Sequence, residues 1–384
     1  MPGDVRQPSL RAFEPVKTER RGARHARAAK AARPAPGITS DTVWTRVQIV
    51  LLVAGFALAG LLLIRPDAGI AIMWNIFIPA APALVTVAPG LWRNICPMST
   101  FSLLPKQFGL SLRTKMPEGL AAWLGLASVI ALYAIVPLRH VLLNTDGRVT
   151  FIMLGAAAAL ALVLGAVFEG RSGWCTSLCP IHPVEKLYGS SPAITPKNAR
   201  CDTCALCTVP CPDTTPSMNP AVTRSNRLME LTGSVLIGSF WGFVFGWYQV
   251  QDYVGPVGTA EIVETYLWPL GAAFVSFAIY NALETWFAQT RPAQRHLQAV
   301  FAAGAVSTYY WFRIPMLVGF GAFPETGLLY DLTAMLPAWF PMASHMLTTS
   351  FFFWFLVIRG RTGTAWVKRP PFARKAGAAV VAAA

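Results

Sequence analysis

The sequence has 384 residues, of which 54% are hydrophobic and only 13% are charged, and its mean hydropathy is +0.47. Soluble domains carry about 25% charged residues, so this composition excludes an ordinary soluble enzyme and indicates a membrane protein. The formal net charge of +14 indicates a nucleic-acid binder only if the basic residues form one patch, so their distribution along the chain decides that question.

Residues 1–45 are rich in Pro, Ala and Arg and contain no long apolar stretch. A segment of this composition cannot bury enough apolar surface to offset the entropy lost on folding. It is therefore predicted to be a disordered basic arm in the cytoplasm. No hydrophobic core follows Arg20 and Arg21 promptly, so the arm does not match a twin-arginine export signal.

Eight apolar stretches follow the arm, and each is long enough to cross a bilayer as a helix. They cover residues 47–64, 68–89, 120–138, 149–168, 231–250, 265–287, 297–320 and 339–358. The predicted fold class is therefore an all-α polytopic membrane protein with about eight transmembrane helices.

The predicted helices divide the rest of the chain into four regions. These are residues 46–168 with four transmembrane helices and a first Cys-Pro loop (90–119), a cytoplasmic iron-sulfur loop at 169–230, four more transmembrane helices in 231–358, and a basic cytoplasmic tail at 359–384.

The basic residues fall almost entirely on one side of the predicted helices. With a cytoplasmic N-terminus, 28 Lys and Arg lie inside and 3 lie outside. Cytoplasmic loops of membrane proteins carry this excess, so both termini are predicted to lie in the cytoplasm, at the inner membrane of a bacterium. The positive charge then contacts anionic lipid, and no nucleic-acid partner is expected.

All seven cysteines lie in the two predicted cytoplasmic loops. They are Cys96, Cys175, Cys179, Cys201, Cys204, Cys207 and Cys211. The last four, with the proline that follows them, form a C-x2-C-x2-C-x3-C-P run, which is the bacterial ferredoxin spacing for a 4Fe-4S cluster. This run predicts a ferredoxin-like insert that binds metal through thiolates.

Zinc is the main alternative metal for such a run. Zinc sites usually separate two Cys-x2-Cys pairs by about a dozen residues or more, whereas here three cysteines follow one another at two-residue spacing. Disulfides are disfavoured because the cytoplasm keeps thiols reduced.

A second motif, Cys175-x3-Cys179-Pro, stands directly after the fourth predicted helix. After the second predicted helix, Trp92 occupies the place of Cys175, and Cys96, also followed by Pro, occupies the place of Cys179. The chain is therefore predicted to repeat a unit of two helices and a Cys-Pro loop, and the first copy has lost one ligand.

These motifs resemble those of the polytopic iron-sulfur membrane proteins of the NosR, NapH and CcoG type, whose C-x3-C-P loops follow transmembrane helices and precede a ferredoxin motif. The resemblance covers about residues 45–230. Such proteins typically have two complete C-x3-C-P loops and often two ferredoxin motifs, whereas this chain has one and a half of the former and one of the latter. A membrane protein implicated in photosynthetic cyclic electron flow is also similar.

Two 4Fe-4S clusters need eight ligands, and the chain has seven thiols. Ferredoxin geometry sends the fourth cysteine of the run to a second cluster, and it favours a first cluster held by Cys201, Cys204, Cys207 and Cys179. The second centre would be held by Cys211, Cys175 and Cys96. It would be a 3Fe-4S centre, a cluster with an open iron, or a cluster with a non-thiol ligand from among Glu169, Asp213 and His182. A single cluster, with the other cysteines structural, is the alternative.

Ionisable groups within membrane spans are functional candidates because their burial in lipid is costly. Arg313 is interpreted as a snorkelling residue at the outer interface, with a quinone or anion contact as the alternative. Glu284 is interpreted as an interfacial carboxylate, with a proton relay as the alternative. His140 and His345 are interpreted as interfacial histidines, and His345 is also a candidate hydrogen-bond donor to a quinone. Haem is not expected, because the chain has no C-x-x-C-H motif.

The predicted function is membrane-bound iron-sulfur electron transfer between a cytoplasmic donor, such as a ferredoxin or flavoprotein, and quinone or a membrane redox complex. The alternatives are an accessory protein that supplies reducing equivalents for the maturation of a respiratory enzyme, and an iron-sulfur redox sensor. No catalytic side chain is predicted, because no hydrolase or nucleotide-binding motif is present.

Overall fold

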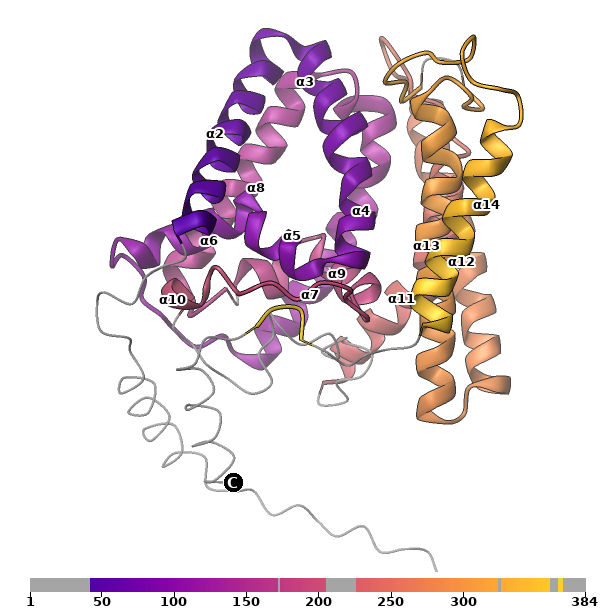
Figure 1. Ribbon diagram of the computed structural model, residues 1–384. Coiled ribbons are helices and arrows are strands. Elements are labelled where there is room, and N and C mark those ends of the chain that lie inside the picture. The colour runs from indigo at the N-terminus through magenta and orange to yellow at the C-terminus, as the bar shows by residue number, and fades with distance from the viewer. Residues whose placement is uncertain (1–41, 172, 205–225, 324–325, 360–364, 369–384) are drawn as a thin grey trace, which may run out of the picture.

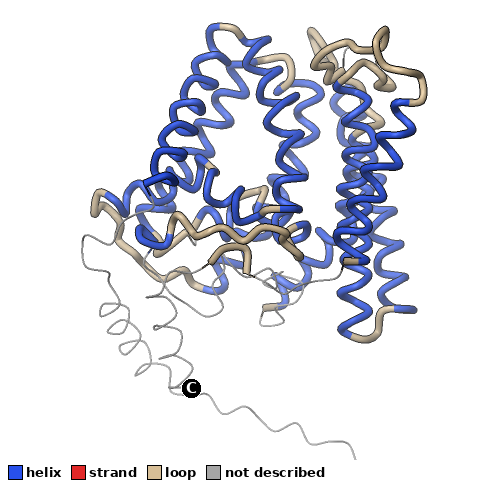
Figure 2. Tube along the Cα trace, in the orientation of Figure 1, coloured by secondary structure: helices blue, strands red, loops and turns tan. Residues whose placement is uncertain are grey.

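The computed structural model describes residues 42–171, 173–204, 226–323, 326–359 and 365–368. The described residues are helical, with isolated bridges between Thr114 and Phe168 and between Lys197 and Lys368 in place of strands. Figure 2 shows helices joined by loops throughout this part of the chain. The predicted all-helical fold is therefore confirmed for the described residues, and it is consistent with a helical polytopic protein. The ferredoxin-like insert remains a prediction, because much of it lies outside the described residues.

The helices follow one another with short connections. In chain order they are α2 (Thr42–Ile64), α3 (Pro66–Ile72), η1 (Met73–Phe77), α4 (Ile78–Val87), α5 (Pro89–Ile95), α6 (Pro97–Gln107), α7 (Glu118–Leu138), η2 (Arg139–Leu143), α8 (Gly147–Val167), η3 (Trp174–Leu178), α9 (His182–Tyr188), α10 (Cys201–Cys204), α11 (Arg227–Trp247), α12 (Thr259–Phe287), α13 (Arg291–Leu317), α14 (Phe340–Phe353) and η4 (Trp354–Ile358). The η elements are π-helical turns that continue or precede α-helices.

Seven helices among the described residues are long and apolar enough to cross a membrane. They span Val43–Ile64, Pro66–Val87, Glu118–Leu143, Gly147–Val167, Arg227–Trp247, Thr259–Phe287 and Phe340–Ile358. Seven of the eight predicted spans therefore have a counterpart of suitable length and composition. In Figure 1, α2 and α8 stand at one side, α12, α13 and α14 stand at the other, and α4 lies between them.

The predicted span 297–320 lies largely in α13, which is a helix but is not apolar enough to be counted with the other seven. Its first two turns carry Arg and Gln side chains, whereas its middle is a run of buried small residues that packs against α11 and α14. A Cβ at Gly304 would meet the ring of Trp241 at 2.5 Å. This helix contacts protein along much of its length, and so it needs less apolar side-chain surface than a helix that faces lipid.

Local sequence explains where several helices begin. The carboxylate of Asp146 accepts the backbone N–H groups of Arg148 and Val149 at the start of α8. The amide oxygen of Asn226 accepts the N–H groups of Leu228 and Met229 at the start of α11. Such side chains satisfy amide groups that have no partner within the helix, and thereby fix its first turn.

The helices α11 and α12 are held close together by glycines four residues apart on α11. A Cβ at Gly242 would overlap the carbonyl oxygen of Ala272, and a Cβ at Gly246 would overlap that of Trp268. Small residues at this spacing let two membrane helices approach backbone to backbone. The tight contact places α11 as a central helix between α12, α13 and α7.

Substitution of Gly242 with alanine is expected to destabilise the protein by about 1–3 kcal/mol, because the added methyl group must push α12 away. Thermal unfolding in detergent measures the effect. The matched control is Gly271→Ala on α12, where an added Cβ meets nothing within 4 Å. Alanine there is expected to leave stability unchanged or slightly raised, so equal unfolding temperatures for the two variants would contradict the packing argument.

Candidate metal centre

Two Cys-Pro corners lie at one end of the helices, which we call the cysteine side and which also carries α10. Cys96 joins α5 to α6 with φ −57° and ψ 119°, and Cys179 joins η3 to the turn before α9 with φ −60° and ψ 120°. The amide of Ser99 donates to the carbonyl of Cys96 (3.2 Å), and the amide of His182 donates to that of Cys179 (3.0 Å). The corners therefore share a local structure, in agreement with the predicted alignment of Cys96 with Cys179.

The two corners are joined by a buried ion pair. Arg93, from the helix before Cys96, places Nη2 2.5 Å from Oε2 of Glu185, on the helix after Cys179, and these side chains are 5% and 7% exposed. The indole Nε1 of Trp92 donates to the other carboxylate oxygen of Glu185 (2.7 Å). The guanidinium of Arg93 also lies 5.3 Å from the ring centroid of Trp366, near the C-terminus. The pair thus links three segments that are distant in the sequence.

The protonation states in this network follow from burial and charge. Burial alone would raise the pKa of Glu185, but the guanidinium of Arg93 and the indole N–H of Trp92 beside it hold that pKa at about 2. Burial lowers the pKa of His182 to about 4, so the ring is neutral near pH 7. Its Nδ1 lies 2.8 Å from Nη2 of Arg93 and accepts that hydrogen bond, which leaves the proton on Nε2. His182 would therefore have to lose the proton on Nε2, or its hydrogen bond with Arg93, to bind a metal.

The thiols of Cys96, Cys175 and Cys179 lie close enough together to influence one another. The pKa of Cys179 is raised well above its ordinary value by burial, and the carboxylate of Glu185, together with Cys175 and Cys96 wherever these thiols ionise, raises it further. Burial also raises the pKa of Cys96. Both thiols are therefore protonated near pH 7 when no metal is bound, and a metal would have to displace these protons to bind.

Two buried cations lie beside these thiols. Arg200, directly before Cys201, donates from Nη2 to the carbonyl of Cys96 (3.3 Å), and burial lowers its pKa to about 10 although Cys96 and Cys175 oppose that shift. Lys106 on α6 donates to the carbonyl of Gly165 (2.6 Å). Burial lowers its pKa to about 8, whereas Cys204 and Cys175 raise it. Positive charge of this kind favours thiolates over thiols.

Five of the seven predicted ligands are among the described residues. Cys96, Cys175 and Cys179 lie at the two corners, and Cys201 and Cys204 lie on α10, which packs against α6. Cys207 and Cys211 lie outside the described residues. Within the part of the chain that the structure describes, no three His, Cys, Asp or Glu side chains form a group that could hold a metal ion. Thiols and cations thus lie together on the cysteine side, but the described residues alone do not form a complete set of metal ligands. Thiolates are ligands that suit a soft metal or an iron-sulfur cluster.

The structure corrects the interpretation of Arg313 as a snorkelling interfacial residue. This side chain is only 2% exposed, and its Nη2 donates to the carbonyl of Trp74 (2.5 Å) and to Oδ1 of Asn75 (2.7 Å). Its hydrogen bonds join α13 to η1, so it does not reach out toward water at an interface. Packing of α13 between other helices, which local sequence does not reveal, accounts for the difference.

The two histidines of the spans have partners within the protein. Both ring nitrogens of His140 have partners within the protein, with Nδ1 2.7 Å from Oδ1 of Asp252 and Nε2 3.1 Å from the carbonyl oxygen of Trp247. The ring of His345 stacks on that of Trp311 with centroids 3.9 Å apart. Glu284 lies one turn from the end of α12.

Several buried charged residues of this region are not among the predicted site residues. Residue type alone does not distinguish Arg93, Glu185, Arg200 and Lys106 from ordinary loop charges, although each whole residue is at most 6% exposed. A sequence signal did exist for two of them, because Arg93 directly follows Trp92 in the first Cys-Pro loop and Arg200 directly precedes the ferredoxin run.

Comparison of the chain with protein-family models, curated proteins and solved structures found no significant match.

Proposed function

We propose that this chain is a membrane-bound iron-sulfur protein of the NosR, NapH and CcoG type that passes electrons between a cytoplasmic donor and quinone or a membrane redox partner. One observation supports the proposal above the others. Thiols from two separate loops lie together with buried cations, at one end of a bundle whose helices suit a membrane. Structural cysteines joined in disulfides carry no negative charge, so they would not need neighbouring cations to offset one.

The residues of the cysteine side have distinct roles in this proposal. Cys201 and Cys204, with Cys207 and Cys211 of the same run, supply thiolates, and Cys96, Cys175 and Cys179 supply them from the two corners. Arg200 and Lys106 offset the negative charge that bound thiolates bring. A bound iron-sulfur cluster supplies one-electron chemistry at a potential that burial and hydrogen bonds adjust. The Arg93–Glu185 pair holds the two corners at a fixed separation.

The partners follow from the placement of these groups. A soluble ferredoxin or flavoprotein would donate electrons at the cysteine side, which the distribution of basic residues predicts to be cytoplasmic. Quinone dissolved in the bilayer would accept two electrons from this donor and two protons to give a quinol. The chain itself has to hold its thiolates at the membrane surface, where both partners can approach.

Anaerobic purification of the full-length protein, with iron, sulfide and zinc analysis and low-temperature EPR, tests the proposal. We expect about four to eight irons per chain, an equal amount of sulfide and a signal that changes on reduction with dithionite. A protein that contains zinc in place of iron, or neither metal after anaerobic purification, would overturn the proposed electron-transfer function.

A further inference from the structure

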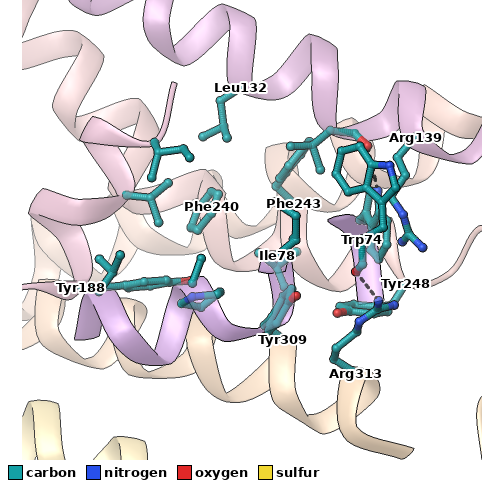
Figure 3. A pocket seen from close by; sticks show the side chains of 18 residues that line it. Trp74, Ile78, Leu132, Arg139, Tyr188, Phe240, Phe243, Tyr248, Tyr309 and Arg313 are labelled. Atoms are coloured by element: carbon teal, nitrogen blue, oxygen red, sulfur yellow. Dashed lines mark hydrogen bonds between the residues drawn. The ribbon is translucent and has the colours of Figure 1, made fainter. Parts of the chain in front are cut away.

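A cavity with a volume of ≈ 210 Å³ lies inside the helix bundle, between η1, α4, α7, α9, α11 and α13. Its wall is largely aliphatic and aromatic. Figure 3 shows that Arg139, Arg313, Tyr248 and Trp74 gather at one end of the cavity, whereas Tyr188 lies at the other. The cavity thus has a polar end and an apolar end.

The polar end contains hydrogen-bond donors that are not satisfied by the described chain. Arg139 is 4% exposed and Arg313 is 2% exposed. Among the described residues, Nε and Nη2 of Arg139, Nε of Arg313 and the hydroxyl of Tyr248 have no hydrogen-bond partner. Buried donors of this kind carry a desolvation cost that a ligand with acceptor oxygens would remove.

The charges at this end are also unbalanced. Nη2 of Arg139 forms an ion pair with Oδ2 of Asp252 at 3.5 Å, a separation too long for a strong hydrogen bond, and no second carboxylate is paired with Arg313 among the described residues. The oxygens of Asp252 are already engaged by His140 (2.7 Å) and Asn144 (2.6 Å). Arginine stays protonated in proteins, so two guanidinium groups face one carboxylate whose oxygens are in use. The excess positive charge favours a ligand that bears partial or full negative charge on oxygen.

The apolar end reaches the candidate metal centre. Ile181, Val184 and Tyr188 line this end, and Ile181 follows Cys179 by only two residues. On another wall, Leu132 and Val136 belong to α7, the helix whose Ser128 hydroxyl donates to the carbonyl of Cys179 (3.0 Å). A ligand in the cavity would therefore sit between the two arginines and the second Cys-Pro corner.

We propose that this cavity binds the ring of a membrane quinone, with its carbonyl oxygens directed toward Arg139, Arg313 and Tyr248. A quinone combines the required features, because it has acceptor oxygens on a flat ring and an otherwise apolar body that suits aromatic and aliphatic walls. Benzoquinones and naphthoquinones share this chemistry. The inference deepens the proposed function, on which it rests, by naming quinone as the partner within the membrane.

Equilibrium binding to the full-length protein in detergent tests the inference. Decylubiquinone and the naphthoquinone menadione are the probes, and quenching of tryptophan fluorescence is the readout, since Trp74 and Trp247 line the cavity. Ala81→Phe fills the cavity and is expected to weaken binding at least tenfold. Tyr248→Phe removes one unsatisfied donor and leaves the ring in place, so about fivefold weaker binding is expected.

Two matched variants control for general effects of the substitutions. Ala156→Phe adds the same ring on an exposed face of α8, and Tyr330→Phe removes the hydroxyl of an exposed tyrosine. Both are expected to bind the better of the two probes within twofold of the unsubstituted protein. Thermal unfolding of all four variants shows whether each is folded, and Tyr248→Phe keeps the test decisive if Ala81→Phe does not fold.

The outcomes separate this inference from the proposed function. Binding that saturates and is weakened by Ala81→Phe and Tyr248→Phe alone supports the cavity as the quinone site, and whichever probe binds more tightly identifies the ring class. Failure of both probes to saturate, or equal affinity in all variants, overturns it. Iron analysis of the same samples reports on the proposed function independently, because quinone binding by an iron-free protein would contradict the metal centre and leave the cavity assignment standing.

Discussion

Replacement of Glu185 with glutamine is expected to lower the free energy of unfolding by about 3 kcal/mol or more. Removing one partner of a buried ion pair leaves the other charge without compensation in a medium that solvates it poorly. Here the uncompensated charge is the guanidinium of Arg93, whose side chain is 5% exposed. The indole of Trp92 also loses a charged acceptor. Chemical unfolding in detergent, followed by tryptophan fluorescence, measures the loss.

The control and the pairwise test use residues of the same kind. Glu118→Gln, at an exposed position in the first turn of α7, changes the same functional group and is expected to change stability by less than about 0.5 kcal/mol. The double variant Arg93→Gln with Glu185→Gln removes both charges and is expected to recover part of the loss. If Glu185→Gln is as stable as Glu118→Gln, the ion pair does not hold the two corners together.

The same carboxylate makes stability depend on acid pH. The pKa of Glu185 is about 2 in the folded protein, below its ordinary value of 4.5. A carboxylate with a lowered pKa contributes stability that is fully present above its unfolded value and is lost as pH falls toward its folded value. The protein should therefore lose this contribution between about pH 4.5 and pH 2, and the Glu185→Gln variant should show a shallower loss over that interval.

Much of the fold could be predicted from the sequence because a membrane helix is encoded locally. A run of about twenty apolar residues specifies a spanning helix whatever its neighbours are, and seven helices of this kind are present among the described residues. The span at 297–320 shows the limit of such reasoning. The first turns of α13 are polar and its middle is buried by α11 and α14, so its environment depends on tertiary packing as well as on its own composition.

The candidate site could be predicted in part, for a related reason. Cysteine spacing is a local pattern, and it identified the corners at Cys96 and Cys179. The ion pair between Arg93 and Glu185 joins residues 92 positions apart, and no local sequence pattern predicts it. The burial of Arg313 against η1 is similar, because its partner Trp74 precedes it by 239 positions. Contacts between residues so distant in sequence depend on how the helices pack together.

Under the proposed function with two iron-sulfur centres, substitution of Cys96 with serine is expected to remove one of them. The assignment that ferredoxin geometry favours places Cys96 with Cys175 and Cys211 on a second centre that already lacks one thiolate. In the described structure Cys96 lies near the thiol of Cys179 and beside Arg200, a position suited to a ligand. A hydroxyl group is a poor ligand for iron in such a cluster, so the centre with only two remaining thiolates should not survive purification.

Anaerobic iron analysis and EPR of the Cys96→Ser variant test whether Cys96 is a cluster ligand. We expect iron to fall to about four per chain and one of two reduced signals to disappear, while the centre held by the ferredoxin run persists. The control is Met98→Leu, a volume-conserving change two residues away that leaves every thiol in place and should preserve both signals. Unchanged iron in the Cys96→Ser variant would show that Cys96 is not a ligand, and the first Cys-Pro corner would then have kept the backbone of a ligand loop after losing its metal.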